Sequence, residues 1–132
     1  MKTALIHTGR TLLALYFLVP GIMKFVDWDR SITLMETHGM SMAPVLLAIA
    51  GIIQIVAGIS LLLNKQVAVC ALGLAAMVLV INLNLHDFWN VYEGVNTRHE
   101  LQNFIKNLGI FAGLLLLGAM HMSPPADSHK SQ

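Results

Sequence analysis

The chain has 132 residues, of which 56% are hydrophobic and 11% charged, and its mean hydropathy is +0.69. A water-soluble domain carries about 25% charged residues, so this chain has too few charges to cover a surface that faces water. The formal net charge of +1 excludes the strongly basic footprint of a nucleic-acid-binding protein. These values predict a single-domain integral membrane protein whose surroundings are the lipid bilayer.

Four apolar segments have the length of a membrane-spanning helix, which is about 20 residues for a hydrocarbon core of about 30 Å. We expect spans at about residues 4–25, 43–63, 67–85 and 104–122. Two longer polar loops, over 26–42 and 86–103, alternate with a tight turn at 64–66. The pattern predicts an all-α, antiparallel, up-down four-helix bundle in the membrane over residues 1–122. Residues 123–132 are polar and contain two prolines, which predicts a disordered tail.

The first apolar segment is expected to stay in the protein, because no small-x-small cleavage site follows it. Four spans place both termini on one side of the membrane. Positively charged residues tie at four on each side, so their count does not decide the orientation. Lys2 and Arg10 flank the first span, and they favour cytoplasmic termini in a bacterial-type inner (plasma) membrane. The lone cysteine, Cys70, forms no intramolecular disulfide and is expected to be a packing residue.

Polar side chains inside a span are costly in lipid and usually face a bundle interior or a cavity. In the first span, steps of three and four residues place on one helical face His7, Arg10, Ala14, Phe17, Gly21 and Lys24. Arg10 and Lys24 are about 21 Å apart along the helix, so they approach opposite membrane boundaries. Two interpretations stay open: these side chains extend to the headgroups, or they point inward and bind an anion, a carboxylate or a quinone oxygen.

Gln54 is the one strongly polar residue of the second span and lies near its middle, with Ala50 and Gly58 one turn to either side. Small residues let another helix approach closely, and an amide can hydrogen-bond across such an interface. A contact with a ligand is the alternative role for this amide. Gly109 and Gly113 in the fourth span form a GxxxG pair, which is also a signal for close packing.

The up-down topology brings the ends of the first and third spans and the start of the fourth to one boundary, that of the long loops. We therefore predict a polar pocket for a quinone-like or small anionic ligand, lined by Lys24, Gln54, Asn82, His86, Asn103, Lys106 and Asn107. His86 is a candidate for proton exchange near neutral pH. Arg10 is assigned to a second polar site or to anchoring the helix. An ordinary polar rim of the bundle is the alternative to a pocket.

A metal site is not expected from this pattern. His86 and Asp87 are adjacent and diverge on a helix, and His99-Glu100 has no second histidine at metal-binding spacing.

Four groups of residues, in order and with suitable gaps, resemble the DoxX family over about residues 10–119. They are Arg10, Ala14, Phe17, Gly21 and Lys24; Gln54, Gly58 and Leu61; His86, Phe88 and Trp89; and Asn103, Lys106, Asn107 and Leu108. The resemblance implies a four-helix inner-membrane protein linked to redox work, since some members are the membrane subunit of thiosulfate:quinone oxidoreductase. Many relatives carry glutamate where this chain has Gln54, and an amide does not exchange protons, which counts against an acid–base role there.

Two functions follow from the resemblance and stay open. The first is a redox-linked subunit that binds a quinone, acting with a redox protein partner because the sequence shows no electron carrier of its own. The second is a non-catalytic membrane chaperone, assembly factor or scaffold, since the wider superfamily also includes chaperones and cargo receptors. The sequence demonstrates no cofactor, although a quinone is a candidate, and it assigns no catalytic residue. A homo-oligomer is a further candidate state of the chain.

Overall fold

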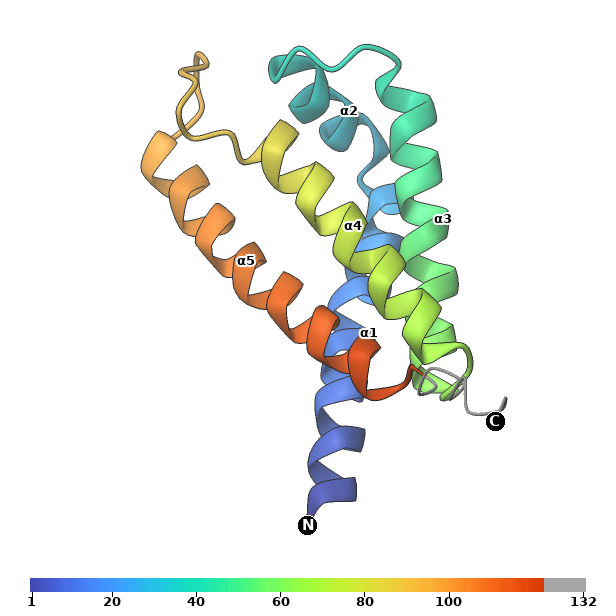
Figure 1. Cartoon of the computed structure of the whole chain (residues 1–132). Helices are drawn as coiled ribbons and strands as arrows, with labels where there is room; N and C mark the ends of the chain where they lie inside the picture. Colours follow the sequence, from blue (N-terminus) through green and yellow to red (C-terminus); the bar gives the residue numbers. More distant parts are fainter. Residues whose placement is uncertain (123–132) are drawn as a thin grey trace, which may run out of the picture.

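The computed structural model describes residues 1–122. This part of the chain forms five helices: α1 (Lys2–Val26), α2 (Trp28–Thr37), α3 (Ala43–Leu62), α4 (Val67–Leu85) and α5 (Thr97–Met120) (Figure 1). Four of them, α1, α3, α4 and α5, are long and apolar enough to cross a membrane. They run alternately up and down, which confirms the predicted all-α four-helix bundle. The predicted tail over 123–132 lies outside the described residues.

The helix that carries the fourth span begins at Thr97, seven residues before the predicted start of that span at about residue 104. Asn96 caps the start of α5, where its Oδ1 accepts hydrogen bonds from the backbone N–H of Arg98 at 3.0 Å and of His99 at 3.2 Å. Such caps satisfy helix N–H groups that have no partner inside the helix. The first two turns are polar, so hydropathy alone assigned them to a loop. This extension places Glu100 on the same helix as Asn103 and Asn107.

The short helix α2 occupies a segment that was predicted to be a loop. Its apolar residues Trp28, Ile32 and Met35 recur at helical spacing, and they pack with Ala43 and Leu47 of α3 and with Leu85 of α4. A ten-residue helix is marginal alone, so this packing accounts for its stability. α2 therefore covers the long-loop end of the bundle (Figure 1).

The bundle consists of two closely packed helix pairs, α1 with α3 and α4 with α5, which are joined through α3 and α4, whereas α1 and α5 touch only sparsely. Glycines allow the α1–α3 approach: a Cβ on Gly58 would lie 3.0 Å from the Leu18 Cβ and 3.1 Å from the Ala14 carbonyl oxygen. The Gly109–Gly113 pair makes no close helix contact within residues 1–122, because a Cβ on either glycine would meet nothing within 4 Å.

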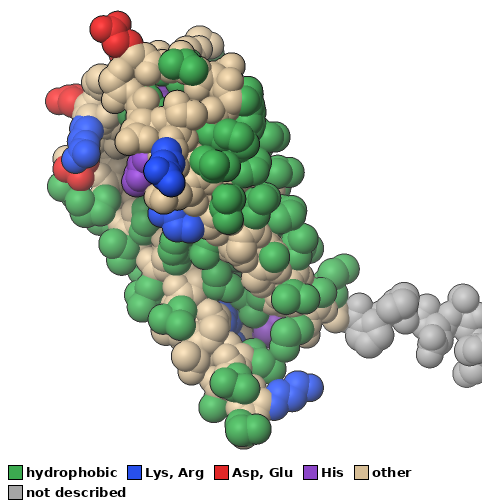
Figure 2. All heavy atoms as spheres, turned by 90° about the vertical axis from the view of Figure 1, so that its left-hand side faces the viewer, with side chains coloured by type: hydrophobic (Ala, Val, Ile, Leu, Met, Phe, Trp, Pro, Cys, Tyr) green, Lys and Arg blue, Asp and Glu red, His purple; other side chains and the backbone are tan. Residues whose placement is uncertain are grey.

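The outer surface of the long helices is largely hydrophobic. In the most apolar stretch of each long helix, no more than a third is buried inside the described chain. The exposed large side chains include Leu12, Val19, Ile52, Val56 and Leu116. In one side view, acidic side chains gather at one end with basic and histidine side chains just below them, and a few more basic and histidine side chains lie at the opposite end (Figure 2). Hydrophobic side chains are spread along the length between the two ends. This distribution matches helices that face lipid along their length.

Candidate ligand pocket

Two adjoining cavities lie at the long-loop half of the bundle. The inner cavity has a volume of about 220 Å³, and its polar lining comes from Tyr16, Lys24, Gln54, His86 and Asn107. The outer cavity has a volume of about 440 Å³ and is lined by Tyr16, His86, Asn103, Lys106, Asn107 and Ile110. Three residues, Tyr16, His86 and Asn107, border both cavities, so a ligand that filled both would pass between them.

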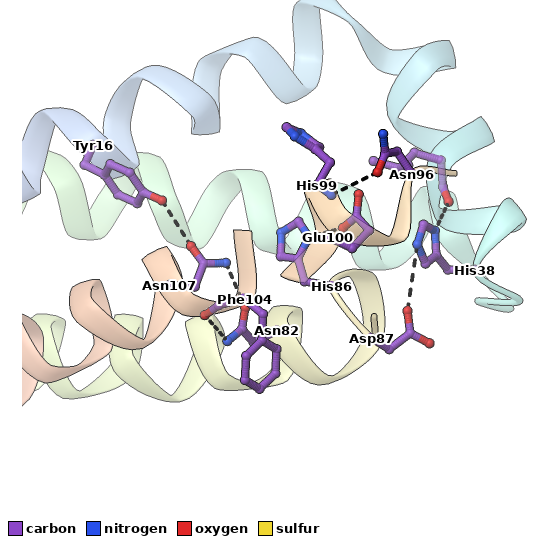
Figure 3. A network of polar contacts seen from close by, with 11 residues as sticks. Tyr16, His38, Asn82, His86, Asp87, Asn96, His99, Glu100, Phe104 and Asn107 are labelled. Atoms are coloured by element: carbon purple, nitrogen blue, oxygen red, sulfur yellow. Dashed lines mark hydrogen bonds and ion pairs between the residues drawn. The ribbon is translucent and has the colours of Figure 1, made fainter. Parts of the chain in front are cut away.

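A chain of amide hydrogen bonds forms the wall behind these cavities. Asn82 of α4 is 1% exposed, and its Nδ2 donates to the Phe104 carbonyl of α5 at 3.0 Å. Its Oδ1 accepts from Asn107 Nδ2 at 3.0 Å, and Asn107 Oδ1 accepts from the Tyr16 hydroxyl of α1 at 3.2 Å (Figure 3). Because Asn82 is buried and each of its amide atoms has a partner inside the protein, its role here is to orient Asn107.

Gln54 of α3 lies on the opposite wall of the inner cavity. It is 5% exposed, and its Oε1 is buried without a hydrogen-bond partner among residues 1–122. The sequence left helix packing and ligand contact open for this amide. Its backbone does pack closely, since a Cβ on Gly21 would lie 2.9 Å from the Gln54 Cβ. No hydrogen bond across the α1–α3 interface satisfies Oε1, which distinguishes Gln54 from Asn82.

His86, which follows the last residue of α4, pairs with Glu100 of α5. His86 Nδ1 lies 2.6 Å from Glu100 Oε2, and both side chains are largely buried (Figure 3). A carboxylate only accepts hydrogen bonds, so Nδ1 carries the proton and Nε2 is the ring nitrogen left to exchange one. His86 borders both cavities, which places this exchangeable group at their junction.

Two lysines supply positive charge to the cavities. Lys24 of α1 is half-buried beside the inner cavity, and Lys106 of α5 is exposed beside the outer one. The ion pairs found within residues 1–122 join histidines to carboxylates and involve neither lysine. Lys24 also borders a larger hollow of about 660 Å³ between α1, α2 and the loop before α5. Lys24 therefore lies between the inner cavity and the hollow at the polar-loop end of the molecule.

The structure thus brings seven predicted residues around one pair of cavities. Lys24, Gln54, His86, Asn103, Lys106 and Asn107 line them, and Asn82 supports Asn107 from behind. The two lysines border different cavities, with His86 between them. Arg10 lies at the other end of the bundle, where it contacts Asn64 and His7.

Sequence reasoning missed Tyr16 and Glu100 as members of this region. Tyr16 precedes Pro20 and Lys24 at steps of four, so it shares their helical face, but its ring was read as part of the apolar span. Glu100 is three residues before Asn103 and seven before Asn107, which places all three on one face of a helix. That relation was hidden because the helix was expected to begin at residue 104.

A second polar cluster ties the loop after α4 to α2. Asp87 Oδ2 accepts hydrogen bonds from the Tyr92 hydroxyl at 2.5 Å and from Asn90 Nδ2 at 2.7 Å. Asp87 Oδ1 lies 3.8 Å from His38 Nε2 (Figure 3). Burial by itself raises the pKa of Asp87, but the hydrogen bonds from Tyr92 and Asn90 and the charge of a protonated His38 together hold that pKa below its ordinary value. The bond to Asp87 raises the pKa of Tyr92.

No group of three or more histidine, cysteine, aspartate or glutamate side chains suited to a metal ion occurs within residues 1–122. The polar groups of the cavities are amides, lysines, a tyrosine and one histidine–carboxylate pair. This set is suited to hydrogen bonding with a carbonyl-bearing or anionic organic ligand.

The fold and its buried polar groups define a small multi-pass membrane protein with four membrane-spanning helices. The DoxX family model matches residues 5–87, which is more than half of the chain, and the protein belongs to the DoxX family. This match confirms the resemblance read from the sequence motifs; it covers α1 to α4 and ends at Asp87, before α5. No curated protein and no solved structure gave a match.

Proposed function

We propose that this protein is a redox-linked subunit of a bacterial-type inner membrane that binds a quinone-like ligand in the paired cavities. The supporting observation is the unpartnered Oε1 of Gln54 at the wall of the inner cavity. A buried polar group without a partner costs about 1–3 kcal/mol, and a ligand that donates a hydrogen bond to Oε1, as a quinol hydroxyl does, recovers this free energy.

The chemistry of the cavity walls fits both oxidation states of a quinone. A quinone carbonyl accepts hydrogen bonds, which Lys24 and the Gln54 amide nitrogen can donate. The hydroxyls of the reduced quinol donate hydrogen bonds, which Gln54 Oε1 can accept. Reduction of a quinone to a quinol takes up two electrons and two protons. His86, with Glu100 behind it, would transfer both protons in turn and be reprotonated from water after each transfer. The electrons come from a partner redox protein.

The size and place of the cavities also fit such a ligand. The inner cavity alone is smaller than the pockets of about 300–1,000 Å³ that usually hold small molecules, whereas the outer cavity adds about 440 Å³. The outer cavity is lined from α1 and α5, the helix pair with few mutual contacts. An apolar quinone tail can therefore leave between these helices towards lipid while the ring stays among the polar groups.

The test is quinone retention and affinity in protein purified with a mild detergent. Mass spectrometry of co-purified molecules identifies a native quinone, and titration with a short-chain quinone measures the dissociation constant. Gln54→Leu should weaken binding at least tenfold, and Lys106→Ala should weaken it several-fold. Asn84→Ala is the matched control, because Asn84 is exposed and its amide bonds only to its own helix at the Val80 carbonyl.

Equal quinone retention by the wild type and by Lys106→Ala and Gln54→Leu would contradict this site. Competition by a small anion such as thiosulfate, with no binding of quinone, would instead assign the lysines to an anionic substrate. A colourless protein that holds a stoichiometric protein partner and no quinone would favour the non-catalytic assembly role.

The proposal includes an orientation. We infer that both termini lie in the cytoplasm, since Lys2 and Arg10 flank the first span and the first helix usually dominates membrane orientation. The paired cavities then lie near the outer face of the membrane, which is where a partner protein would reach them.

A further inference from the structure

Arg10 is a buried cation at the end of the bundle that carries the short turn. It is 6% exposed, and its Nη1 donates to Asn64 Oδ1 at 2.5 Å while its Nη2 donates to His7 Nδ1 at 3.0 Å. Because His7 Nδ1 accepts this hydrogen bond, His7 is neutral here. Arg10 Nε is buried without a partner within residues 1–122. The guanidinium therefore has two neutral partners and no carboxylate in the described chain.

The distribution of charge explains why no carboxylate of residues 1–122 lies close to Arg10. Six of the seven acidic residues belong to the long-loop end: Asp27, Asp29, Glu36, Asp87, Glu93 and Glu100. The seventh, Asp127, is outside the described residues. The short-turn end carries Lys2, Arg10 and Lys65. A buried charge is stabilised by a counter-ion, so the described part of this end lacks one for Arg10.

A groove of about 330 Å³ runs beside Arg10 between α1 and α5, the two sparsely packed helices. Its walls are apolar, with Leu5, Ile6 and Leu13 from α1 and Leu116, Leu117 and Met120 from α5. Gly9 and Gly113 also line it, and a Cβ on either glycine would meet nothing within 4 Å. The groove thus combines open apolar space with one buried cation near the membrane boundary.

We propose that this groove binds one anionic phospholipid, whose phosphate pairs with Arg10 and whose acyl chain lies between α1 and α5. The phosphate supplies the missing negative charge, and the guanidinium fork matches phosphate oxygens. A free inorganic anion accounts for the charge but leaves the apolar walls unfilled. A zwitterionic lipid such as phosphatidylcholine also carries a phosphate, but its choline cation offsets that negative charge, so it compensates the charge of Arg10 less well. The site is separate from the paired cavities, which share no lining residue with it.

The experiment measures which lipid stays on the protein. The purified full-length chain is stripped of lipid in detergent, incubated with equal amounts of phosphatidylglycerol and phosphatidylcholine, and purified again. Native mass spectrometry then counts the lipids on each protein. We expect one retained phosphatidylglycerol per chain and at least fivefold less phosphatidylcholine. Arg10→Gln should lose this preference, whereas Lys2→Gln, which removes an exposed cation at the same end, should keep it.

A second pair of variants tests the groove without removing the charge. Gly113→Leu places a side chain where the acyl chain is proposed to lie, and it should lower phosphatidylglycerol retention at least threefold. Gly109→Leu is its matched control on the same helix, since Gly109 is equally unobstructed and does not line the groove. Both replacements favour the helix relative to glycine, so loss of folding is not expected to account for a difference.

Three results would overturn the proposal. Equal retention of both lipids by the wild type would remove the anionic preference. Equal phosphatidylglycerol retention by Arg10→Gln and Lys2→Gln, or by Gly113→Leu and Gly109→Leu, would remove the site. Displacement of phosphatidylglycerol by excess inorganic phosphate would assign Arg10 to a free anion. An Asp127→Asn variant with increased lipid retention would identify the tail carboxylate as a competitor for the same cation, which supports an anion site at Arg10.

Discussion

Asn82 and Gln54 are two buried amides with different roles at the scale of single residues. Asn82 makes two hydrogen bonds that join α4 to α5, whereas Gln54 Oε1 has no partner in the described chain. Hydrogen bonds between membrane helices contribute about 0.6 kcal/mol on average and up to about 1.7 kcal/mol. Asn82 is therefore expected to contribute to the stability of the bundle, and Gln54 to ligand binding.

We predict that Asn82→Ala lowers the free energy of unfolding in detergent by about 1–3 kcal/mol, because two interhelical hydrogen bonds are lost. Gln54→Leu should leave the unfolding free energy unchanged or raise it, since it removes an unpaired polar atom. Unfolding by a denaturing detergent, followed by circular dichroism, measures both changes. A larger loss from Gln54→Leu than from Asn82→Ala would contradict this division of roles.

The ionisation of Asp87, in the loop after α4, makes the stability of the fold depend on pH. Its pKa is lower in the folded protein than in the unfolded chain, so the ionised carboxylate stabilises the fold above the ordinary aspartate pKa of about 4. This contribution is lost as the pH falls through the lower, folded-state value. The hydrogen bond to Asp87 raises the pKa of Tyr92. The stabilisation that the protonated Tyr92 hydroxyl gives the fold is therefore present at neutral pH and is lost only as the pH rises past about 10.

We predict that Asp87→Asn destabilises the protein by about 1 kcal/mol at pH 6, where the carboxylate hydrogen bonds are intact, and that this effect shrinks as the pH falls below the ordinary aspartate pKa of about 4. Melting temperatures of wild type and variant across this range give the measurement. Parallel curves for the two proteins would show that Asp87 does not carry this dependence.

At the scale of helices, the α1–α3 contact depends on glycines. A Cβ on Gly58 would lie 3.0 Å from the Leu18 Cβ, whereas a Cβ on Gly73 of α4 would meet nothing within 4 Å. We predict that Gly58→Val destabilises the bundle by about 1–3 kcal/mol through overpacking, while Gly73→Val has an effect near zero. Thermal melting in detergent compares the two. Equal effects would mean that α1 and α3 do not approach as closely as described.

Hydropathy predicts the four spans well because lipid imposes the same requirement on each of them: a run of about 20 apolar residues. It fails where water and protein contacts decide the structure. The apolar face of α2 is only three residues wide, and its stability comes from Ala43, Leu47 and Leu85, which are distant in sequence. The early start of α5 depends on the Asn96 cap and a polar first turn.

The candidate site, too, could be predicted from the sequence only in part. Lys24, His86 and Lys106 were predicted to share one membrane boundary because an up-down topology requires it. The pairing of His86 with Glu100 required the true start of α5. The hydrogen bond from Tyr16 to Asn107 required knowing that α1 and α5 approach at this depth. Contacts between side chains follow from helix rotation, which sequence spacing alone does not determine.

At the scale of the whole molecule, two different sites lie along the sparse α1–α5 contact, one lined mainly by polar residues and the other mainly by apolar ones. The outer cavity lies along it at the long-loop end, and the apolar groove beside Arg10 lies along it at the short-turn end. The α1–α3 and α4–α5 contacts are extensive, so among the four long helices the α1–α5 contact is where ligands with apolar chains have access from lipid. A lipid held beside Arg10 would contact the same two helices that line the outer cavity.

Cytoplasmic termini can be tested with single cysteines that leave the charges unchanged. In a Cys70→Ala background, Ser41→Cys labels the long-loop end and Leu63→Cys labels the short-turn end; both positions are exposed. A maleimide that does not cross membranes should modify Ser41→Cys in intact spheroplasts and Leu63→Cys only after permeabilisation. The physical reason is that Lys2 and Arg10 at the start of the first span are retained on the cytoplasmic side. The reverse pattern would place the paired cavities near the cytoplasm and direct the search for a redox partner to that side.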